Sequence, residues 1–211
     1  ELSPTTTLIY NADDPLCASI AARVPNASIA FGIDGATNTE SDRISDSRFC
    51  SQCNAPLEYD YVQYGQLGAY HFPSCGWARP GLVRRVTGVE LGCDGYGFDL
   101  VFGSAPDAAA AHIATRYNGL YMVYNVAAAF FAAHELGVDT AHLQPTLDAY
   151  VPAGGRMGRW DIAGRTVEAN LAKNPVGFDR QIQSIKTAGG RLCAFFLNDN
   201  DADGHDVSWI Y

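Results

Sequence analysis

Three cysteines in one short stretch of this sequence have the spacing of metal ligands. Cys50 and Cys53 form a C-x-x-C pair, and the Asn-Ala-Pro-Leu that follows has the turn chemistry to point two thiolates at one centre. Cys75 lies one hairpin later, but Phe72 stands where the first cysteine of a second pair is expected. His71 is the only nearby residue that offers a fourth donor. The spacing therefore predicts a zinc site of three thiolates, completed by His71 or a water.

Two other interpretations of this segment stay open. The hairpin can keep its shape without a metal, because Phe72 can fill the space that a ligand would take. A redox-active C-x-x-C is the third interpretation, but the surrounding sequence lacks a thioredoxin-like βαβ pattern. The sequence start has no signal-peptide pattern, which favours thiols or metal ligands over disulfides. Cys17 and Cys193 lie in apolar surroundings, where we expect small core residues.

The last fifteen residues concentrate negative charge. Four aspartates fall within residues 199–206, straight after the apolar run 192–196, which we expect to be a buried strand. Loops that follow the strands of open α/β sheets commonly form ligand sites. The spacing D-x-D-x-D-G at 199–204 matches the first half of a calcium loop, but Ile210 stands where such a loop needs a glutamate. The pattern therefore disfavours calcium and leaves another cation, a basic partner or water to hold these charges.

Composition excludes several classes of protein. The 211 residues are 47% hydrophobic and 18% charged, enough for one large or two small domains with a core. A formal net charge of -9 argues against a nucleic-acid surface, which needs basic side chains against phosphates. No apolar run is long enough to span a membrane. We therefore expect a cytoplasmic protein.

Turn residues and apolar periodicity predict an α/β protein. Before the cysteines, the pattern indicates a strand at 8–11, a helix at 16–23 that starts from Asp14-Pro15, and a strand at 28–32. After them it indicates an antiparallel strand pair at 86–91 and 98–102, then helices at 121–136 and 141–150.

A segment rich in proline and glycine, residues 151–155, has the composition of a domain joint. Beyond it we expect a strand hairpin that turns at Gly164, a helix at 179–188 and the strand 192–196. The sequence thus predicts a larger first part and a smaller second part.

Five motifs follow one another in an order that points to one family. They are N-A-D-D-P at 11–15, G-L-Y-M-V-Y-N at 119–125, G-R at 155–156, K-N-P-V-G at 173–177 and N-D-N-D-A-D-G-H-D-V-S-W at 198–209. With the cysteine-rich insertion, the chain resembles the MurT family, the Mur-ligase-like subunits of lipid II isoglutaminyl synthase.

The resemblance implies a fold and its division. Residues 1–150 would be part of a Mur ligase central domain, a parallel sheet flanked by helices, with a zinc-ribbon hairpin inserted at 47–81. Residues 151–211 would be part of a Rossmann-like C-terminal domain.

The resemblance also implies an activity. Members of this family use ATP and Mg²⁺ to activate the α-carboxyl of D-glutamate in the lipid II stem peptide as an acyl phosphate. Ammonia from a GatD-like glutamine amidotransferase subunit then attacks, giving D-isoglutamine. Phosphorylation supplies the leaving group that a carboxylate lacks, and cations offset the charge. The lipid II substrate lies at the inner membrane face.

Site residues carry over only where the motifs match. For the nucleotide, the resemblance favours Asn125 on the adenine side, with Asn118 at the approach to the same helix as a further candidate. A guanidinium at Arg156 suits phosphate recognition, and Lys173 is either a phosphate or carboxylate contact or simply the end of a strand. For the glutaminase partner, it implies an aspartate that orients the partner's catalytic histidine, with Asp199, Asp203 and Asp206 as candidates.

The chain departs from the family in ways that limit these expectations. No G-x-x-x-x-G-K-[ST] occurs, so we expect a fragment that does not hydrolyse ATP by itself. Phe72, Met122 and Gly158 replace a cysteine, an asparagine and a glutamate of the usual motifs. Two alternatives therefore stay open: a non-catalytic interaction or scaffold module, and a conventional Mur ligase that adds an amino acid.

Overall fold

The structure, a computed structural model, describes residues 2–37, 49–50, 53–92, 95–117, 119–151 and 158–172, with the short stretches 177–178, 181–182, 185–186 and 192–196. In chain order its elements are β1 (Leu8–Asn11), α1 (Pro15–Ala21), β2 (Ser28–Ile33), β3 (Glu58–Tyr64), β4 (Leu67–His71), β5 (Arg84–Gly92), β6 (Gly95–Val101), β7 (Ala110–Thr115), α2 (Leu120–Glu135), a 3-10 turn (Thr140–His142), α3 (Leu143–Ala149), β8 (Gly158–Ile162) and β9 (Arg165–Ala169).

The main sheet is mixed, so the expectation of a parallel sheet is only partly right. Its strand order is β1-β2-β5-β6-β7, and only the β1–β2 and β2–β5 pairs are parallel. The β5–β6 and β6–β7 pairs are antiparallel. A parallel pair needs a long crossover connection, whereas only two residues of sequence separate β5 from β6.

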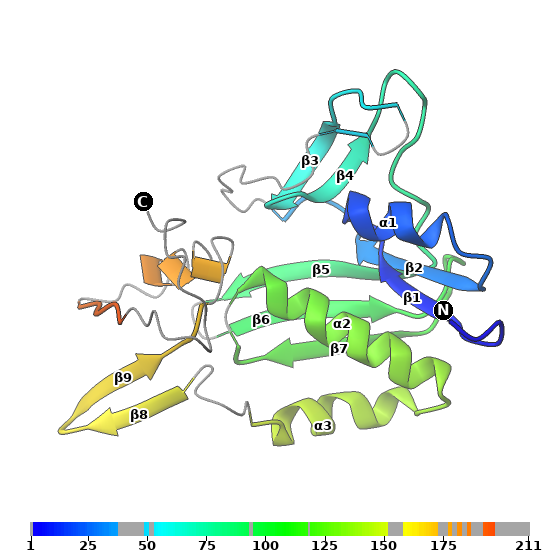
Figure 1. Cartoon of the computed structure of the whole chain (residues 1–211). Helices are drawn as coiled ribbons and strands as arrows, with labels where there is room; N and C mark the ends of the chain where they lie inside the picture. The colour runs from blue at the N-terminus through cyan, green and yellow to red at the C-terminus, as the bar shows by residue number, and fades with distance from the viewer. Residues whose placement is uncertain are drawn as a thin grey trace.

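One core lies between the sheet and the helices α2 and α3 (Figure 1). Its fully buried side chains include Val86, Phe98 and Leu100 of the sheet and Val123 and Phe131 of α2. Because neighbouring residues of a strand face opposite sides, Ile9 of β1 packs against this core while Tyr10 packs with Ala18 of α1. Helices therefore cover both faces of the sheet at β1.

The start of α1 and the end of α2 are set by local contacts and backbone conformation. The Asp14 carboxylate accepts a hydrogen bond from the Leu16 amide at 2.9 Å, with Pro15 in the first turn, so α1 starts where the sequence predicts. Helix α2 stops at Glu135, and Gly137 follows with φ of +86°, a conformation that suits glycine.

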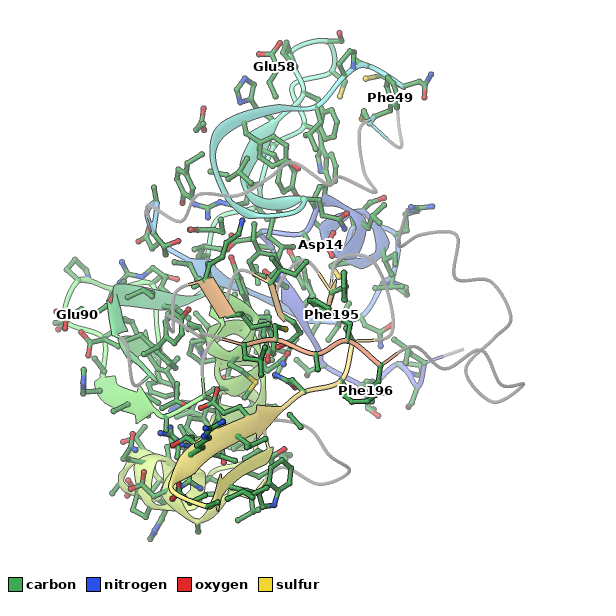
Figure 2. The ribbon with its side chains drawn as sticks, turned by 90° about the vertical axis from the view of Figure 1, so that its left-hand side faces the viewer. Asp14, Phe49, Glu58, Glu90, Phe195 and Phe196 are labelled. Atoms are coloured by element: carbon green, nitrogen blue, oxygen red, sulfur yellow. The ribbon has the colours of Figure 1, made fainter. Side chains whose placement is uncertain are left out.

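The cysteine-rich insertion forms a separate hairpin of β3 and β4, which stands above α1 in Figure 1. Its small core contains Cys50, Tyr70 and Phe72, with Trp77 packed against it. Phe72 stacks on Trp77 with ring centroids 5.3 Å apart. Figure 2 shows Phe49 and Glu58 at the end of this hairpin farthest from Asp14.

The second part of the chain agrees with the sequence in its hairpin and disagrees in its last apolar run. Strands β8 and β9 pair around the predicted turn at Gly164. Residues 192–196 form no strand and are exposed, and Phe196 is 93% exposed (Figure 2). No described strand pairs with this run, so the prediction of a buried strand is wrong there. Cys193 is likewise exposed and Cys17 only half-buried, so neither is a core residue.

Among the residues that the structure describes, no helix has both the length and the apolar character that crossing a membrane requires.

Candidate functional site

The thiols of Cys50, Cys53 and Cys75 meet at one point of the β3–β4 hairpin. Their sulfur atoms all lie within 4.8 Å of one another, and those of Cys50 and Cys75 are 3.7 Å apart. Two thiolates on a tetrahedral zinc with Zn–S bonds of about 2.3 Å lie about 3.8 Å apart. The cluster therefore fits a zinc ion without large rearrangement, and these three residues would hold it.

His71 does not join this cluster. Its ring nitrogens face two carboxylates instead, with Nε2 3.4 Å from Glu58 and Nδ1 3.5 Å from Asp60. Among the described residues, the group with metal-ligand geometry contains the three cysteines alone. The structure thus brings together three of the four residues that the sequence predicts as ligands.

A second polar centre lies beneath the hairpin and was not expected from the sequence. Asp13, fully buried just after β1, accepts hydrogen bonds from the Ile33 amide at 2.8 Å and the Tyr124 hydroxyl at 2.7 Å. Its other oxygen lies 2.8 Å from Nη1 of Arg79, which also donates to the Ile33 carbonyl at 3.2 Å. One carboxylate therefore joins β1, β2, α2 and the segment that leads from β4 to β5.

Further hydrogen bonds join the β3–β4 hairpin to the residues around Asp13. The Gly68 amide of β4 donates to the Asp13 carbonyl at 3.0 Å, and the Gln66 amide group donates to Asp14 at 3.1 Å. The Tyr61 hydroxyl of β3 donates to the Ile33 carbonyl at 3.3 Å. The hairpin is thus held against the ends of β1 and β2 on several sides.

Burial sets the electrostatics of this centre. It raises the pKa of Asp13, although the Tyr124 hydroxyl, the Ile33 amide and Arg79 each lower that pKa in part. Burial and the neighbouring Asp13 charge raise the pKa of Tyr124 well above its ordinary value. Tyr124 therefore stays protonated and acts as a hydrogen-bond donor.

The sequence carries one local signal for this centre. Asp13 and Asp14 form a pair at the end of a strand, and only Asp14 is needed to start α1. Arg79 is the companion cation, but it lies 66 residues away. A second aspartate that has no role in the helix start is a sign of a buried partner.

Of the predicted nucleotide-binding residues, the structure describes Asn125. It lies on the exposed face of α2, next to the buried Tyr124, and its amide group is 3.9 Å from the Met122 sulfur. Several other predicted site residues fall outside the described residues: Asn118, Arg156, Lys173, Asp199, Asp203 and Asp206.

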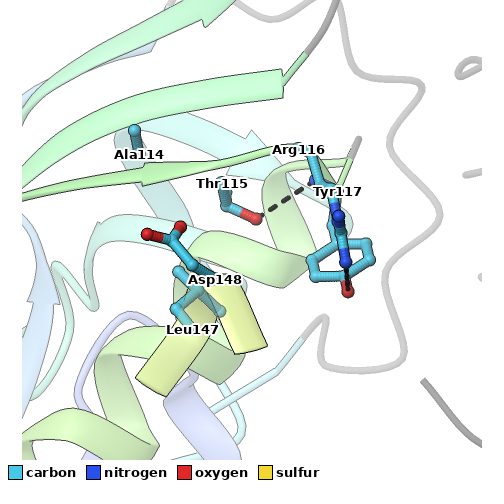
Figure 3. Close-up of a pocket in the computed structure, with 6 residues that line it drawn as sticks. All are labelled: Ala114, Thr115, Arg116, Tyr117, Leu147 and Asp148. Carbon is cyan, nitrogen blue, oxygen red and sulfur yellow. Dashed lines mark hydrogen bonds between the residues drawn. The ribbon is translucent and has the colours of Figure 1, made fainter. Parts of the chain in front are cut away.

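A small hollow lies beside the segment that leads from β7 toward α2 (Figure 3). It is lined by Ala114, Thr115, Arg116, Tyr117, Leu147 and Asp148. The Tyr117 hydroxyl donates to the Tyr150 carbonyl at 2.6 Å, and Arg116 donates to the same carbonyl at 3.2 Å. These contacts fix the chain just before the predicted domain joint.

Comparison with known families and proteins finds similarity to MurT proteins. The family described as MurT ligase C-terminal matches residues 171–211. The chain is 31% identical over 210 residues to the MurT subunit of lipid II isoglutaminyl synthase (glutamine-hydrolyzing) from Streptococcus pneumoniae (strain ATCC BAA-255 / R6). It is 29% identical over 206 residues to the corresponding subunit from Staphylococcus aureus (strain COL). These matches cover 99% and 97% of this chain but only 45% of each relative's length.

Solved structures agree on the fold. A pseudomurein peptide ligase type C from Methanothermus fervidus matches with a TM-score of 0.68 and 26% identity, over 85% of this chain and 34% of that one. MurF from Acinetobacter baumannii matches with a TM-score of 0.55 and 17% identity, over 88% of this chain and 30% of that one. The mixed sheet with its helices is thus found within Mur-type ligases.

Proposed function

We propose that this chain, a homologue of MurT, is part of the ligase subunit of an enzyme that amidates lipid II. The observation that carries the proposal is similarity at 29–31% identity along 97–99% of the chain, including the cysteine-rich hairpin. The reaction would convert the α-carboxyl of D-glutamate in the stem peptide to an amide. The chain spans 45% of the length of these relatives, so the activity of the whole relative is part of the proposal.

The proposed division of labour follows from what the residues can do. ATP would supply the phosphoryl group that turns the carboxylate into an acyl phosphate, and magnesium would offset the phosphate charge. Asn125 is an exposed amide on a helix held by a buried ion-pair centre, a suitable donor and acceptor for an adenine edge. Asn118, Arg156 and Lys173 would complete nucleotide recognition.

The cysteine cluster would hold a structural zinc ion. A metal there would tie together the two turns of the hairpin, which is too small to bury a large core. The hairpin in turn contacts Asp13, so we propose that zinc stabilises the central sheet through it.

We propose that the part from residue 151 onward belongs to a second domain and that its acidic loop meets the partner. A GatD-like glutaminase needs a group that orients its catalytic histidine. Asp199, Asp203 and Asp206 are the candidates, with Asp199 favoured because it is the nearest of the three to the apolar run 192–196. Ammonia released by the partner would then attack the activated carboxyl.

Reconstitution tests this function. The full-length protein and a co-expressed GatD-like glutaminase would be mixed with lipid II, ATP, magnesium and glutamine. The expected product carries an amide in place of one stem-peptide carboxyl, detected by mass spectrometry, and glutamine is consumed in step. Asp199→Asn should lower glutamine hydrolysis while ATP binding persists. A product that instead gains an amino acid would overturn the proposal.

A second candidate function has one observation in its favour. The likeness to a pseudomurein peptide ligase, at 26% identity, fits a ligase that joins an amino acid or peptide. Both reactions use an activated carboxyl, and they differ in the nucleophile. The same assay distinguishes them when free amino acids and ammonium salts are supplied separately.

A further inference from the structure

The two segments that carry the cysteines share a pair of backbone hydrogen bonds at matching positions. In the first, the Asn54 amide donates to the Cys50 carbonyl at 3.0 Å, and the Cys50 amide donates to the Ala55 carbonyl at 2.9 Å. In the second, the Gly76 amide donates to the Phe72 carbonyl at 2.9 Å, and the Phe72 amide donates to the Trp77 carbonyl at 2.8 Å.

The residues that follow Cys53 and Cys75 also share a backbone conformation. Asn54 has φ of +56° and Gly76 has φ of +72°, both in the left-handed region. Cys53 and Cys75 precede them and occupy equivalent places. By the same correspondence, Phe72 is the structural counterpart of Cys50, and both are buried, at 1% and 3% exposure.

The Phe72 ring therefore takes the position at which a second C-x-x-C pair would supply the fourth sulfur ligand. The Phe72 ring is stacked on Trp77 and packs edge-on against Tyr70, with centroids 6.1 Å apart. It offers no donor atom. His71, the neighbouring residue with a donor, faces Glu58 and Asp60. The described part of the chain thus supplies three sulfur ligands and no fourth one.

We propose that the Cys50–Cys53–Cys75 cluster binds a zinc-class ion with an open fourth position, occupied by water and exchangeable for small sulfur or nitrogen donors. The inference rests on the metal binding proposed above and adds a ligand site to it. Cys53 and Cys75 are exposed, so the cluster lies at the surface, where solvent reaches it. A closed shell of four protein ligands leaves no place for an outside ligand, whereas an open fourth position lets the ion bind one.

Cobalt substitution tests the open position, because the absorption of Co²⁺ reports its ligands. In the full-length protein loaded with Co²⁺, addition of 2-mercaptoethanol should raise the thiolate-to-metal absorption by about one third, from three sulfurs to four. Imidazole should shift the d–d bands without that rise. A wild-type spectrum that already corresponds to four protein ligands, and that neither addition changes, would overturn the open position and leave metal binding intact.

Phe72→Cys is the matched variant, since it places a thiol at the equivalent of Cys50. It should show the four-sulfur spectrum from the start, ignore both additions and retain zinc against a chelator on the order of 100-fold better, because each ligand contributes to zinc affinity. Cys17→Ser, outside the cluster, should behave as the wild type.

Two measurements keep the test independent of how well Phe72→Cys folds. X-ray absorption of the zinc-loaded wild type should count three sulfur neighbours and one lighter atom. Metal analysis and intact mass should show about one zinc per chain. A wild type without metal, or with Cys50 and Cys75 joined as a disulfide, would overturn both the open position and the proposed zinc site.

Discussion

Asp13 and Arg79 form an ion pair, 2.8 Å from Oδ1 to Nη1, in which the carboxylate is fully buried. The pair joins the end of β1 to the segment that returns from the cysteine-bearing hairpin to β5. The hairpin is inserted between two neighbouring strands of the sheet, β2 and β5, so the segment that returns from it to β5 needs a defined position. Arg79 fixes it, because the guanidinium contacts both Asp13 and the Ile33 carbonyl.

Replacing Arg79 should destabilise the fold strongly. Arg79→Met keeps the length of the side chain but leaves the Asp13 carboxylate buried without its cation. Breaking one side of a buried ion pair costs about 3–5 kcal/mol of unfolding free energy. Urea denaturation followed by circular dichroism measures the loss. The double variant Asp13→Asn/Arg79→Met removes both charges, so its loss should be smaller than the sum of the two single losses. Additive losses would show that the pair is not coupled.

The Tyr124 hydroxyl should stabilise the same carboxylate. Tyr124→Phe removes a hydrogen bond of 2.7 Å to a buried charged group, which is worth about 1.5–3 kcal/mol. The control is Tyr70→Phe. The Tyr70 hydroxyl is buried and no described residue hydrogen-bonds to it, so its removal should leave stability unchanged or slightly raised. Equal losses in the two variants would contradict this assignment.

Close contact between Gly32 and Asp13 should exclude any side chain at position 32. A Cβ atom built there would lie 2.4 Å from Oδ1 of Asp13, whose position is set by its other contacts. Gly32→Ala should therefore cost about 1–3 kcal/mol in thermal or urea denaturation. Gly81→Ala is the control, since a Cβ at Gly81 meets no atom within 4 Å. A Gly32→Ala protein as stable as its control would show that Asp13 moves freely.

The sequence predicts most local elements because their signals are local. Helix α2 has a run of apolar residues and a glycine at its end, and the prediction of 121–136 differs from the structure by one residue at each boundary. Strand β7 was not predicted, because its A-A-H-I-A-T has weak strand propensity and gains its conformation from pairing with β6. For residues 192–196 the error is the opposite one, because a strand was expected and none forms. An apolar run favours burial, but it does not identify the strand with which it would pair.

The candidate site likewise has a part that the local sequence predicts and a part that depends on distant residues. The C-x-x-C spacing predicts that Cys50, Cys53 and Cys75 meet, because one hairpin joins them. It does not predict which way His71 points, since that depends on carboxylates across the hairpin at Glu58 and Asp60. The Asp13 centre combines residues up to 111 positions apart, as for Asp13 and Tyr124, and only the fold brings them together.

Cys17 should react slowly with alkylating reagents. Burial, the Asp14 charge and a hydrogen bond to Asp14 at 3.5 Å raise the pKa of the Cys17 thiol to about 11. The reactive thiolate would then be about one part in a thousand at pH 8, and alkylation should be on the order of 100-fold slower than in unfolded protein. The rate should climb as pH rises toward 11, because the raised pKa keeps the thiol protonated below it. Peptide mass spectrometry after iodoacetamide treatment measures this.

Asp14→Asn is the matched control for Cys17. Asparagine starts helices about as well as aspartate, so α1 should persist. The variant removes the negative charge beside the thiol, which should lower the pKa of Cys17 and speed its alkylation. An unchanged rate would mean that burial alone protects Cys17.

Asn125 offers a test of nucleotide binding that is separable from folding. Its side chain is exposed on α2, so Asn125→Ala should change the free energy of unfolding by no more than about 0.5 kcal/mol. In the full-length protein it should weaken ATP binding about tenfold, because one hydrogen bond to the base is lost. Calorimetric titration measures the affinity. Ala129→Gln, a change on the exposed face one turn further along α2, should leave ATP binding as it is. If Asn125→Ala binds ATP as tightly as the wild type, the adenine lies elsewhere and α2 serves only to cover the sheet.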